Sequence, residues 1–283
     1  MIEIKGLCHT YGRGTAFAKK ALDDINLTIE KGSFVGLIGH TGSGKSTLVQ
    51  HLNVLLRPEA GQILIDGEDI NADKGRLKAI RTKVGLVFQY PEHQLFDMTV
   101  YKDVSFGPKN IGLEEDEIKE RVEAALAVVG ITPDMYEKSP FELSGGQKRR
   151  VAIAGVLAMR PDILVLDEPA AGLDPHGRNE ILNQIKHMHE TLNITVILVS
   201  HSMEDIARLV KRILVIDHGK IVMQGSPVEI FSRFEELEAV GLSSTQTAYI
   251  MRDLKASGMK LPSHIFTVED AVSAILKELG HDR

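Results

Sequence analysis

A glycine-rich segment early in the chain has the residue types that phosphate binding requires. Residues 39–47 read GHTGSGKST and match the pattern G-x-x-x-x-G-K-[ST], in which glycines let successive backbone N–H groups point at phosphate oxygens. The apolar run FVGLI precedes the segment and TLVQHLNVLL, which looks helical, follows it, so the required strand, loop and helix are in place. Lys45 is expected on the β- and γ-phosphates and the Ser46 hydroxyl on Mg²⁺. The predicted loop comprises Gly39, His40, Thr41, Gly42, Ser43, Gly44, Lys45, Ser46 and Thr47.

Two neighbouring acids follow an apolar run farther along the chain. The segment ILVLDEP contains Asp167 and Glu168, and its apolar residues predict a buried strand that delivers both carboxylates to its end. Asp167 can hold the Mg²⁺ shell there, and Glu168 can accept a proton from an attacking water. Two acids at a strand end can equally cap the next helix. Together with the phosphate loop, however, they predict a site that hydrolyses a nucleotide.

A third segment offers a second surface for phosphate. Residues 143–147 read LSGGQ and comprise Leu143, Ser144, Gly145, Gly146 and Gln147. Ser144 is a natural helix N-cap, and the two glycines expose backbone N–H groups at a helix start. Because one mononucleotide needs only one cradle, we expect two chains arranged head to tail, with each LSGGQ closing over the nucleotide of the other chain.

Short β-rich runs through the first 225 residues predict the scaffold that positions these segments. Several runs are continuously hydrophobic, which is typical of strands buried on both faces in a parallel sheet covered by helices. The run DINLTI instead alternates, as a strand with one wet face does. We therefore expect an α/β fold with a parallel-sheet core and an antiparallel, half-exposed edge. The runs begin at Ile2, Asp24, Ser33, Gln62, Val84, Ile163, Thr195, Ile213 and Lys220.

Helical patterns occupy the middle and the end of the chain. Between Leu113 and Gly130 apolar residues recur at helical spacing behind an acidic first turn, which indicates a helical subdomain over roughly residues 90–160. After residue 225 the strands stop, and the apolar stripes predict helices at 227–240, 244–257 and 267–279. We therefore expect two units: an ATP-binding domain at 1–225, and at 226–283 a small helical module for dimerisation or another interaction.

The order of the three motifs resembles that of the ABC-type ATPases. A phosphate loop followed by LSGGQ and then ILVLDEP marks that family, and the resemblance covers residues 1–225. It implies a P-loop NTPase fold with ATP and Mg²⁺ as cofactors. By resemblance, Tyr11 stacks on adenine, Gln89 contacts Mg²⁺ and the attacking water, and His201 is the switch histidine on the γ-phosphate. Asp174 in AGLDP resembles the aspartate of the loop between the two ATP sites.

Longer segments are similar to one subfamily. FQYPEHQLF, starting at Phe88, and RRVAIAGVLAMRPDILVLDEPAAGLDP resemble the ATP-binding subunits of energy-coupling factor transporters, the cobalt and vitamin importers, and come closest to the second of their two paired ATPases. This implies three partners: a second ABC ATPase, either a paralogue, which is favoured, or an identical copy; a transmembrane coupling subunit; and a membrane-embedded substrate-binding protein. The segment after Gln89 is implied to face the membrane partner. Its expected contact residues are Tyr90, His93, Gln94, Leu95 and Phe96.

The composition of the chain limits which partners and which cellular location are expected. With 33 basic and 39 acidic residues the net charge is −6, which argues against a protein that coats nucleic acid by bulk charge. The basic residues 148–150 are expected on a solvated face or at a dimer contact. A single cysteine and the lack of a secretory layout around Met1 predict a reduced, cytoplasmic compartment. Apolar stretches such as 151–159 are far shorter than the roughly 20 residues that span a bilayer, so we expect peripheral attachment to the cytoplasmic face of the cell membrane.

Other functions fit the sequence less well. The alternatives are the ATPase of another ABC transporter and a soluble ABC protein of translation or DNA repair, although the latter usually carries two such domains or a long coiled coil. A regulatory subunit with a dead site is disfavoured because all the expected site residues are present. No N-K-x-D motif occurs, which favours ATP over GTP. His187 and His189 lie two apart on a predicted helix and so face different directions, and no metal site made of protein ligands alone is expected.

Overall fold

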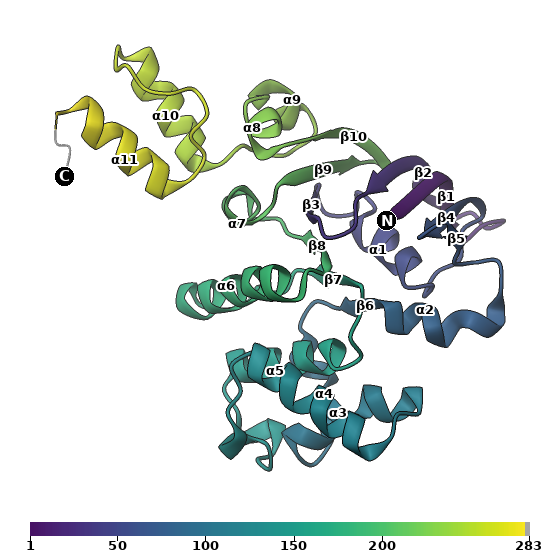
Figure 1. The fold of residues 1–283 in the computed structure, drawn as a ribbon. Helices are drawn as coiled ribbons and strands as arrows, with labels where there is room; N and C mark the ends of the chain where they lie inside the picture. Colours follow the sequence, from purple (N-terminus) through teal and green to yellow (C-terminus); the bar gives the residue numbers. More distant parts are fainter. Residues whose placement is uncertain (281–283) are drawn as a thin grey trace.

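A six-stranded sheet forms the centre of the computed structural model, which describes residues 1–280 (Figure 1). The strand order is β10-β9-β3-β8-β7-β6, in which neighbours are parallel except for β10, which is antiparallel to β9. The predicted α/β fold with a parallel core is thereby confirmed. The strands are β3 (Phe34–Ile38), β6 (Val84–Val87), β7 (Ile163–Asp167), β8 (Thr195–Val199), β9 (Arg212–Asp217) and β10 (Lys220–Gly225).

The antiparallel strands form mainly a second sheet instead of an edge of the first. Its order is β2-β1-β4-β5, with β1 (Ile2–Tyr11), β2 (Lys19–Ile29), β4 (Ala60–Ile65) and β5 (Glu68–Asp69). In β2 the residues from Ile25 to Ile29 alternate between buried and exposed, as the pattern of DINLTI predicts. The two-residue strand β5 is too short to give a sequence signal.

Alternate residues of the central strands point into two hydrophobic layers. In β7, Leu164 and Leu166 join the layer formed with the helices of the middle of the chain, whereas Ile163 and Val165 join the layer formed with α1 and the antiparallel sheet. Both faces are therefore buried, which explains the continuous apolar runs. The helices of the first 210 residues are α1 (Lys45–Leu52), α2 (Leu77–Lys83), α3 (Val100–Ile111), α4 (Glu115–Val128), α5 (Gly145–Leu157), α6 (Pro175–Leu192) and α7 (Met203–Leu209).

Helices α3, α4 and α5 form the helical subdomain that the sequence predicts between about residues 90 and 160 (Figure 1). The apolar residues Ile118, Val122 and Leu126 of α4 are buried together with residues of the two neighbouring helices. Within the described residues, no helix is both long and apolar enough to cross a lipid bilayer.

The C-terminal segment is helical, but the helix predicted over 227–240 is interrupted. It divides into α8 (Pro227–Phe231) and α9 (Phe234–Ala239), because Arg233 leaves the helical conformation with φ −94° and ψ 60°. Phe231 and Leu237 are both buried in the large core. They are six residues apart, so on one straight helix they would face directions that differ by about 120°, and the break lets both turn inward. The other helices are α10 (Gln246–Ala256) and α11 (Val268–Glu278).

A buried arginine joins the helical subdomain to the sheet. Arg149 in α5 is only 1% exposed, and its guanidinium donates to both carboxylate oxygens of Glu92 at 2.9 and 2.6 Å. The same group donates to the carbonyls of Pro169 and Ala171 at 2.9 and 2.8 Å, directly after β7. The expectation that residues 148–150 form a solvated face or a dimer contact is therefore wrong for Arg149.

The ion pair of Arg149 should matter for stability in a way that surface ion pairs do not. Replacing Arg149 with Met leaves the Glu92 carboxylate half-buried and without its partner, for which we expect a loss of about 3–5 kcal/mol in the free energy of unfolding. The matched control is Arg160→Met, which removes an exposed pair with Glu120 at 2.6 Å and should cost less than about 1 kcal/mol. Urea unfolding followed by circular dichroism measures both, and equal losses would contradict this role for Arg149.

Candidate active site

The carboxyl ends of four parallel strands bring the predicted catalytic segments to one edge of the sheet. In register, Leu37 of β3 lies beside Val199 of β8, which in turn lies beside Asp167 of β7, and Val87 of β6 lies beside Leu166. The phosphate loop follows β3, Gln89 follows β6, Glu168 follows β7 and His201 follows β8. Ligands of open α/β sheets bind at such an edge.

Two glycines of the phosphate loop pack directly against backbone carbonyl oxygens and leave no room for a side chain. A Cβ atom at Gly39 would lie 2.2 Å from the carbonyl oxygen of Ile216, and one at Gly44 would lie 2.6 Å from that of Ala21. Gly44 also has a φ of +116°, which favours glycine, and directly precedes α1. Glycine is therefore required at both positions, and the N–H groups at the start of α1 remain available to an anion.

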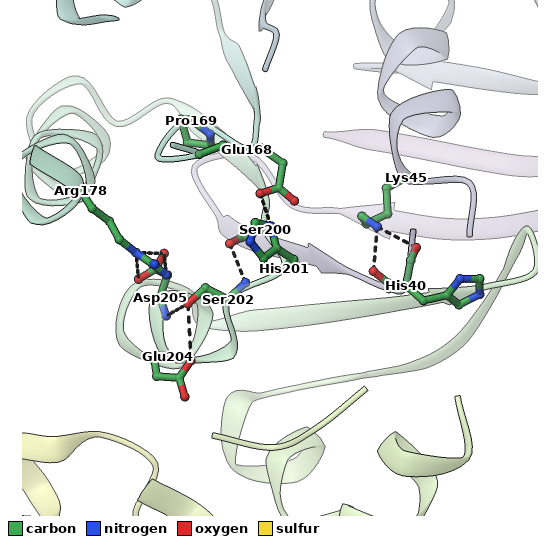
Figure 2. A network of polar contacts seen from close by, with 12 residues as sticks. His40, Lys45, Glu168, Pro169, Arg178, Ser200, His201, Ser202, Glu204 and Asp205 are labelled. Carbon is green, nitrogen blue, oxygen red and sulfur yellow. Dashed lines mark hydrogen bonds and ion pairs between the residues drawn. The ribbon is translucent and has the colours of Figure 1, made fainter. Parts of the chain in front are cut away.

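Lys45 lies across this loop. Its ammonium donates to the carbonyls of Gly39 at 2.7 Å and His40 at 3.0 Å (Figure 2). Burial lowers the pKa of Lys45, and the charges of Glu168 and Asp167 oppose that shift. A partly desolvated cation beside a glycine-rich loop at a helix start is suited to bind a polyphosphate.

Two further hydroxyls belong to this loop, those of Ser46 and Ser43. Burial raises the pKa of Asp167, and the Ser46 hydroxyl and the charge of Lys45 oppose the rise. The Ser43 hydroxyl is buried and, within residues 1–280, has no hydrogen-bond partner. Buried polar groups are normally paired, so an unsatisfied hydroxyl in a glycine-lined loop fits a phosphate ligand. Hydroxyl and carboxylate oxygens such as those of Ser46 and Asp167 are also the ligands that Mg²⁺ prefers.

Glu168 and His201 face one another at the ends of β7 and β8. The Nδ1–H of His201 donates to Oε2 of Glu168 at 2.6 Å (Figure 2). Burial raises the pKa of Glu168, and the neighbouring His201 opposes the rise. A carboxylate with a raised pKa is a better proton acceptor, as a general base requires. The backbone of Glu168 is left-handed, with φ +54°, which costs about 1–2 kcal/mol for a residue with a Cβ.

Two residues expected from the family resemblance lie at the rim of this site. The hydroxyl of Tyr11, at the end of β1, is 3.3 Å from that of Thr47 in the phosphate loop, and its ring is partly exposed. Gln89 is exposed, two residues beyond the end of β6. The Tyr11 side chain thus contacts the phosphate loop, and Gln89 follows a strand that ends at the same edge of the sheet. Their contacts with adenine, Mg²⁺ and water stay predictions.

The LSGGQ segment lies elsewhere in the molecule. It begins α5 in the helical subdomain, whereas α1, which follows the phosphate loop, packs on the opposite face of the sheet (Figure 1). Ser144 and Gln147 form the reciprocal capping box, with N···O distances of 3.0 and 3.3 Å. Nothing lies within 4 Å of where a Cβ would stand at Gly145 or Gly146, so the backbone there is open to an approaching group. Asp174 accepts from the N–H of Gly177 at 2.7 Å as the N-cap of α6.

The expected membrane-partner segment is only partly on the surface. Tyr90, His93, Gln94 and Phe96 are exposed, and Phe96, at 59% exposure, packs edge-on against Phe106 of α3. Leu95, in contrast, is 7% exposed and belongs to the large hydrophobic core. Leu95 nevertheless lines a groove together with Gln94 and Phe96, after the short 3₁₀ helix Pro91–Gln94, and its contact with a partner stays a prediction.

Two ion pairs that were not identified from the sequence join the elements around the site. Glu92 and Arg149 are 57 positions apart, and Arg178 of α6 and Asp205 of α7 are 27 apart. Arg178 binds Asp205 through three contacts of 2.7–3.2 Å, which ties α6 to the helix that follows His201 (Figure 2). No short-range pattern in a single sequence reveals such distant pairs.

Comparison with known proteins identifies the family. The sequence model described as "ABC transporter" matches residues 22–171. The energy-coupling factor transporter ATP-binding protein EcfA2 of Clostridium tetani is 55% identical over 277 residues, which cover 98% of this chain and 96% of that protein. EcfA2 of Caldanaerobacter subterraneus is likewise 55% identical, covering 98% and 97% of the two chains.

Solved structures of the same fold agree. CbiO1 of Clostridium perfringens, described as part of the ABC transporter complex CbiONQ, has a TM-score of 0.75 at 41% identity and covers 84% of this chain and 93% of its own. A dimeric, ADP- and phosphate-bound form of the ATP-binding cassette MJ0796 has a TM-score of 0.71 at 30% identity, covering 80% and 98% of the two chains. This chain therefore belongs to the ABC ATPase family, among the ATP-binding proteins of energy-coupling factor transporters.

Proposed function

We propose that this chain uses ATP hydrolysis to drive uptake of a vitamin or a transition-metal ion, as one of two ATPases beneath a membrane subunit and a substrate-binding protein. The observation that carries the proposal is the convergence of Lys45, Asp167, Glu168 and His201 at one edge of the parallel sheet. The 55% identity to EcfA2 proteins over nearly the whole chain supports the transporter subfamily.

Each site residue has a role that follows from its position. Lys45 and the loop N–H groups would bind the β- and γ-phosphates, and Ser46, Asp167 and Gln89 would hold Mg²⁺. When bound, Mg²⁺ neutralises charge on the phosphate oxygens. Glu168 takes the proton from the attacking water, while His201, held at 2.6 Å from it, reaches toward the γ-phosphate.

A second ATPase completes the site. Because the LSGGQ segment begins in the helical subdomain, away from the chain's own phosphate loop, its exposed Ser144 and open glycines serve the nucleotide of the neighbouring chain. Asp174, in the loop after Glu168, is proposed to lie between the two nucleotides. The dimeric, ADP-bound MJ0796 cassette supports this arrangement, and a paralogue is proposed as the natural neighbour.

A groove beside Phe96 is the proposed seat of the membrane subunit. It has a volume of about 710 Å³ and lies between α2, α3 and α5, with Gln94, Phe96, Phe106 and Met159 among its lining residues. Exposed aromatic side chains above a concave surface are typical of protein interfaces. Since Gln94 and Phe96 line the groove, a partner seated in it would contact the segment that follows Gln89. Binding there would hold the chain at the cytoplasmic face of the membrane.

The C-terminal module offers a second interaction surface. Val268, Val272 and Leu276 form one exposed stripe along α11, while the other face of the module packs into its own small core around Met251 and Leu261. We propose that residues 226–283 use this stripe for dimerisation or another protein contact.

The base and the phosphate loop should fail in different ways when they are mutated. Glu168→Gln should keep ATP affinity but lower turnover by about 10² to 10⁴, because a positioned base is worth that much. Lys45→Ala should instead weaken ATP binding itself, since it removes the charge on the β- and γ-phosphates. ATPase assays and titration with a fluorescent ATP analogue separate the two effects. Normal turnover of the Glu168 variant would rule out its role as base.

Mixing two inactive variants tests the composite site. A chain with Ser144→Arg and a chain with Lys45→Ala should each lose activity, but their mixed dimer retains one intact pair of phosphate loop and LSGGQ, so part of the ATPase activity should return. If the second ATPase is a different chain, one change is placed in each of the two. Activity that shows no dependence on mixing would contradict a head-to-tail dimer.

Exposed and buried residues of the segment after Gln89 should separate coupling from folding. Phe96→Ala should spare ATP binding but reduce copurification with the membrane subunit and uncouple ATP hydrolysis from substrate uptake, because Phe96 is an exposed interface residue. Leu192→Ala, an exposed apolar residue at the end of α6, is the control and should change neither. Leu95→Ala should mainly destabilise the fold, by about 2–5 kcal/mol.

The same copurification distinguishes the transporter from its alternative. A second ATPase and a small integral membrane protein in mild detergent support the proposal. Ribosomes or DNA in their place would overturn it in favour of a soluble ABC protein.

A further inference from the structure

Three side chains with metal-binding atoms converge beside the phosphate loop, on the side away from the catalytic pair. They are His40 of the loop, and Asp217 and His218 at the turn between β9 and β10. Asp217 Oδ1 lies 2.8 Å from Nε2 of His40 and 2.8 Å from Nδ1 of His218, and all three atoms lie within 4.8 Å of one another. Figure 2 shows the ring of His40 directed away from Glu168 and His201.

The hydrogen bonding of His40 suits a metal ligand. Its Nδ1 lies 2.8 Å from the carbonyl oxygen of Thr41, and since a carbonyl can only accept, Nδ1 carries the proton. The carboxylate of Asp217, 2.8 Å from Nε2, likewise only accepts, so Nε2 also carries a proton in this structure, and a bound metal ion would replace that proton. Histidine ligands of metals characteristically donate their other N–H to a backbone carbonyl in this way.

The backbone holds the three groups together. The N–H of Gly219 donates to the carbonyl of Ser43 at 2.8 Å, which fixes the β9–β10 turn to the phosphate loop. His218 has a φ of +44°, a left-handed conformation that is rare for a residue with a Cβ. With this backbone conformation, the His218 ring contacts Oδ1 of Asp217, which is also the oxygen that His40 contacts. The His218 side chain is 83% exposed, so a cation reaches the cluster directly from solvent.

We propose that His40, Asp217 and His218 form a binding site for one divalent transition-metal ion of the Zn²⁺, Co²⁺ or Ni²⁺ class, separate from the Mg²⁺ of the nucleotide. Two imidazole nitrogens and one carboxylate oxygen suit these borderline cations, whereas Mg²⁺ prefers oxygen ligands alone. Three protein ligands leave a position for water. The site departs from the expectation, drawn from His187 and His189, that protein ligands alone form no metal site here.

Metal at this site acts on the phosphate loop. The carbonyl of His40 accepts from Lys45 at 3.0 Å, so a cation that joins His40 to Asp217 and His218 fixes the loop to the β9–β10 turn. A metal ion that binds the folded chain but not the unfolded chain raises the melting temperature. Metal binding itself does not depend on the transport function proposed above, whereas any effect on ATP affinity does.

The test is a titration of the full chain with Co²⁺, without nucleotide or Mg²⁺, followed by visible absorption and calorimetry. We expect about one Co²⁺ per chain at this site, displaced by Zn²⁺. His218→Asn and Asp217→Asn should each weaken binding about tenfold or more, because each removes a ligand. Asparagine is chosen at 218 because it tolerates the left-handed backbone.

Two controls keep the result specific to this site. His201→Ala removes the only other close histidine–carboxylate pair at the sheet edge that the described residues provide, and His264→Ala removes an exposed histidine of the C-terminal module. Both variants should bind Co²⁺ as the unaltered chain does. Zn²⁺ should also raise the melting temperature of the unaltered chain but not of His218→Asn, provided that circular dichroism finds both folded.

Two outcomes, and a third in the His201 control, would overturn the proposal. One is binding of Co²⁺ and Zn²⁺ by the unaltered chain that is too weak to saturate at submillimolar metal. The other is binding by His218→Asn and Asp217→Asn with unchanged affinity, which would place the metal elsewhere. Loss of binding in His201→Ala alone would assign it to the catalytic pair.

Discussion

The parallel alignment of β3, β8, β7 and β6 is the constraint on which the active site depends. Segments that are up to 162 residues apart in the chain, from Gly39 of the phosphate loop to His201, meet because their strands end at one edge. Hydrophobic packing on both faces fixes the strand register, and a slip by one residue would turn every apolar side chain to the wrong face. The catalytic geometry is thus maintained by burial far larger than any single polar contact at the site.

Arg149 extends this constraint to the helical subdomain. Its one guanidinium contacts Glu92, in the segment that follows Gln89, and the carbonyls of Pro169 and Ala171, in the turn that follows Glu168. Three parts of the proposed mechanism therefore share one buried group: the membrane-facing segment, the start of the LSGGQ helix and the turn after the base. Buried charges that lose a partner are costly, so these parts move together more readily than separately.

The extent to which the sequence predicted the site follows from the range of the interactions. The phosphate loop, Asp167 with Glu168, and the cap formed by Ser144 depend on residues within a few positions, and the structure has the expected local conformation at each. The inward turn of Leu95, the Glu92–Arg149 pair and the break between α8 and α9 depend on what lies opposite in space. A single sequence does not reveal such contacts. In the segment that contains Tyr90, Leu95 and Phe96, nothing in the residue types shows that Leu95 is buried and the two aromatic side chains are exposed.

Two turns beside the proposed site contain left-handed residues, as several other turns of the chain do. Glu168 and Tyr90 both have left-handed backbones, with φ of +54° and +55°, although neither is glycine. Each follows a central strand closely, and each begins a turn that the Arg149 network holds, through Pro169 and Ala171 in one case and Glu92 in the other. Strained residues persist where the surroundings over-determine them. The buried arginine supplies that restraint, so the same group that joins the subdomain to the sheet also fixes the conformation of the catalytic turn.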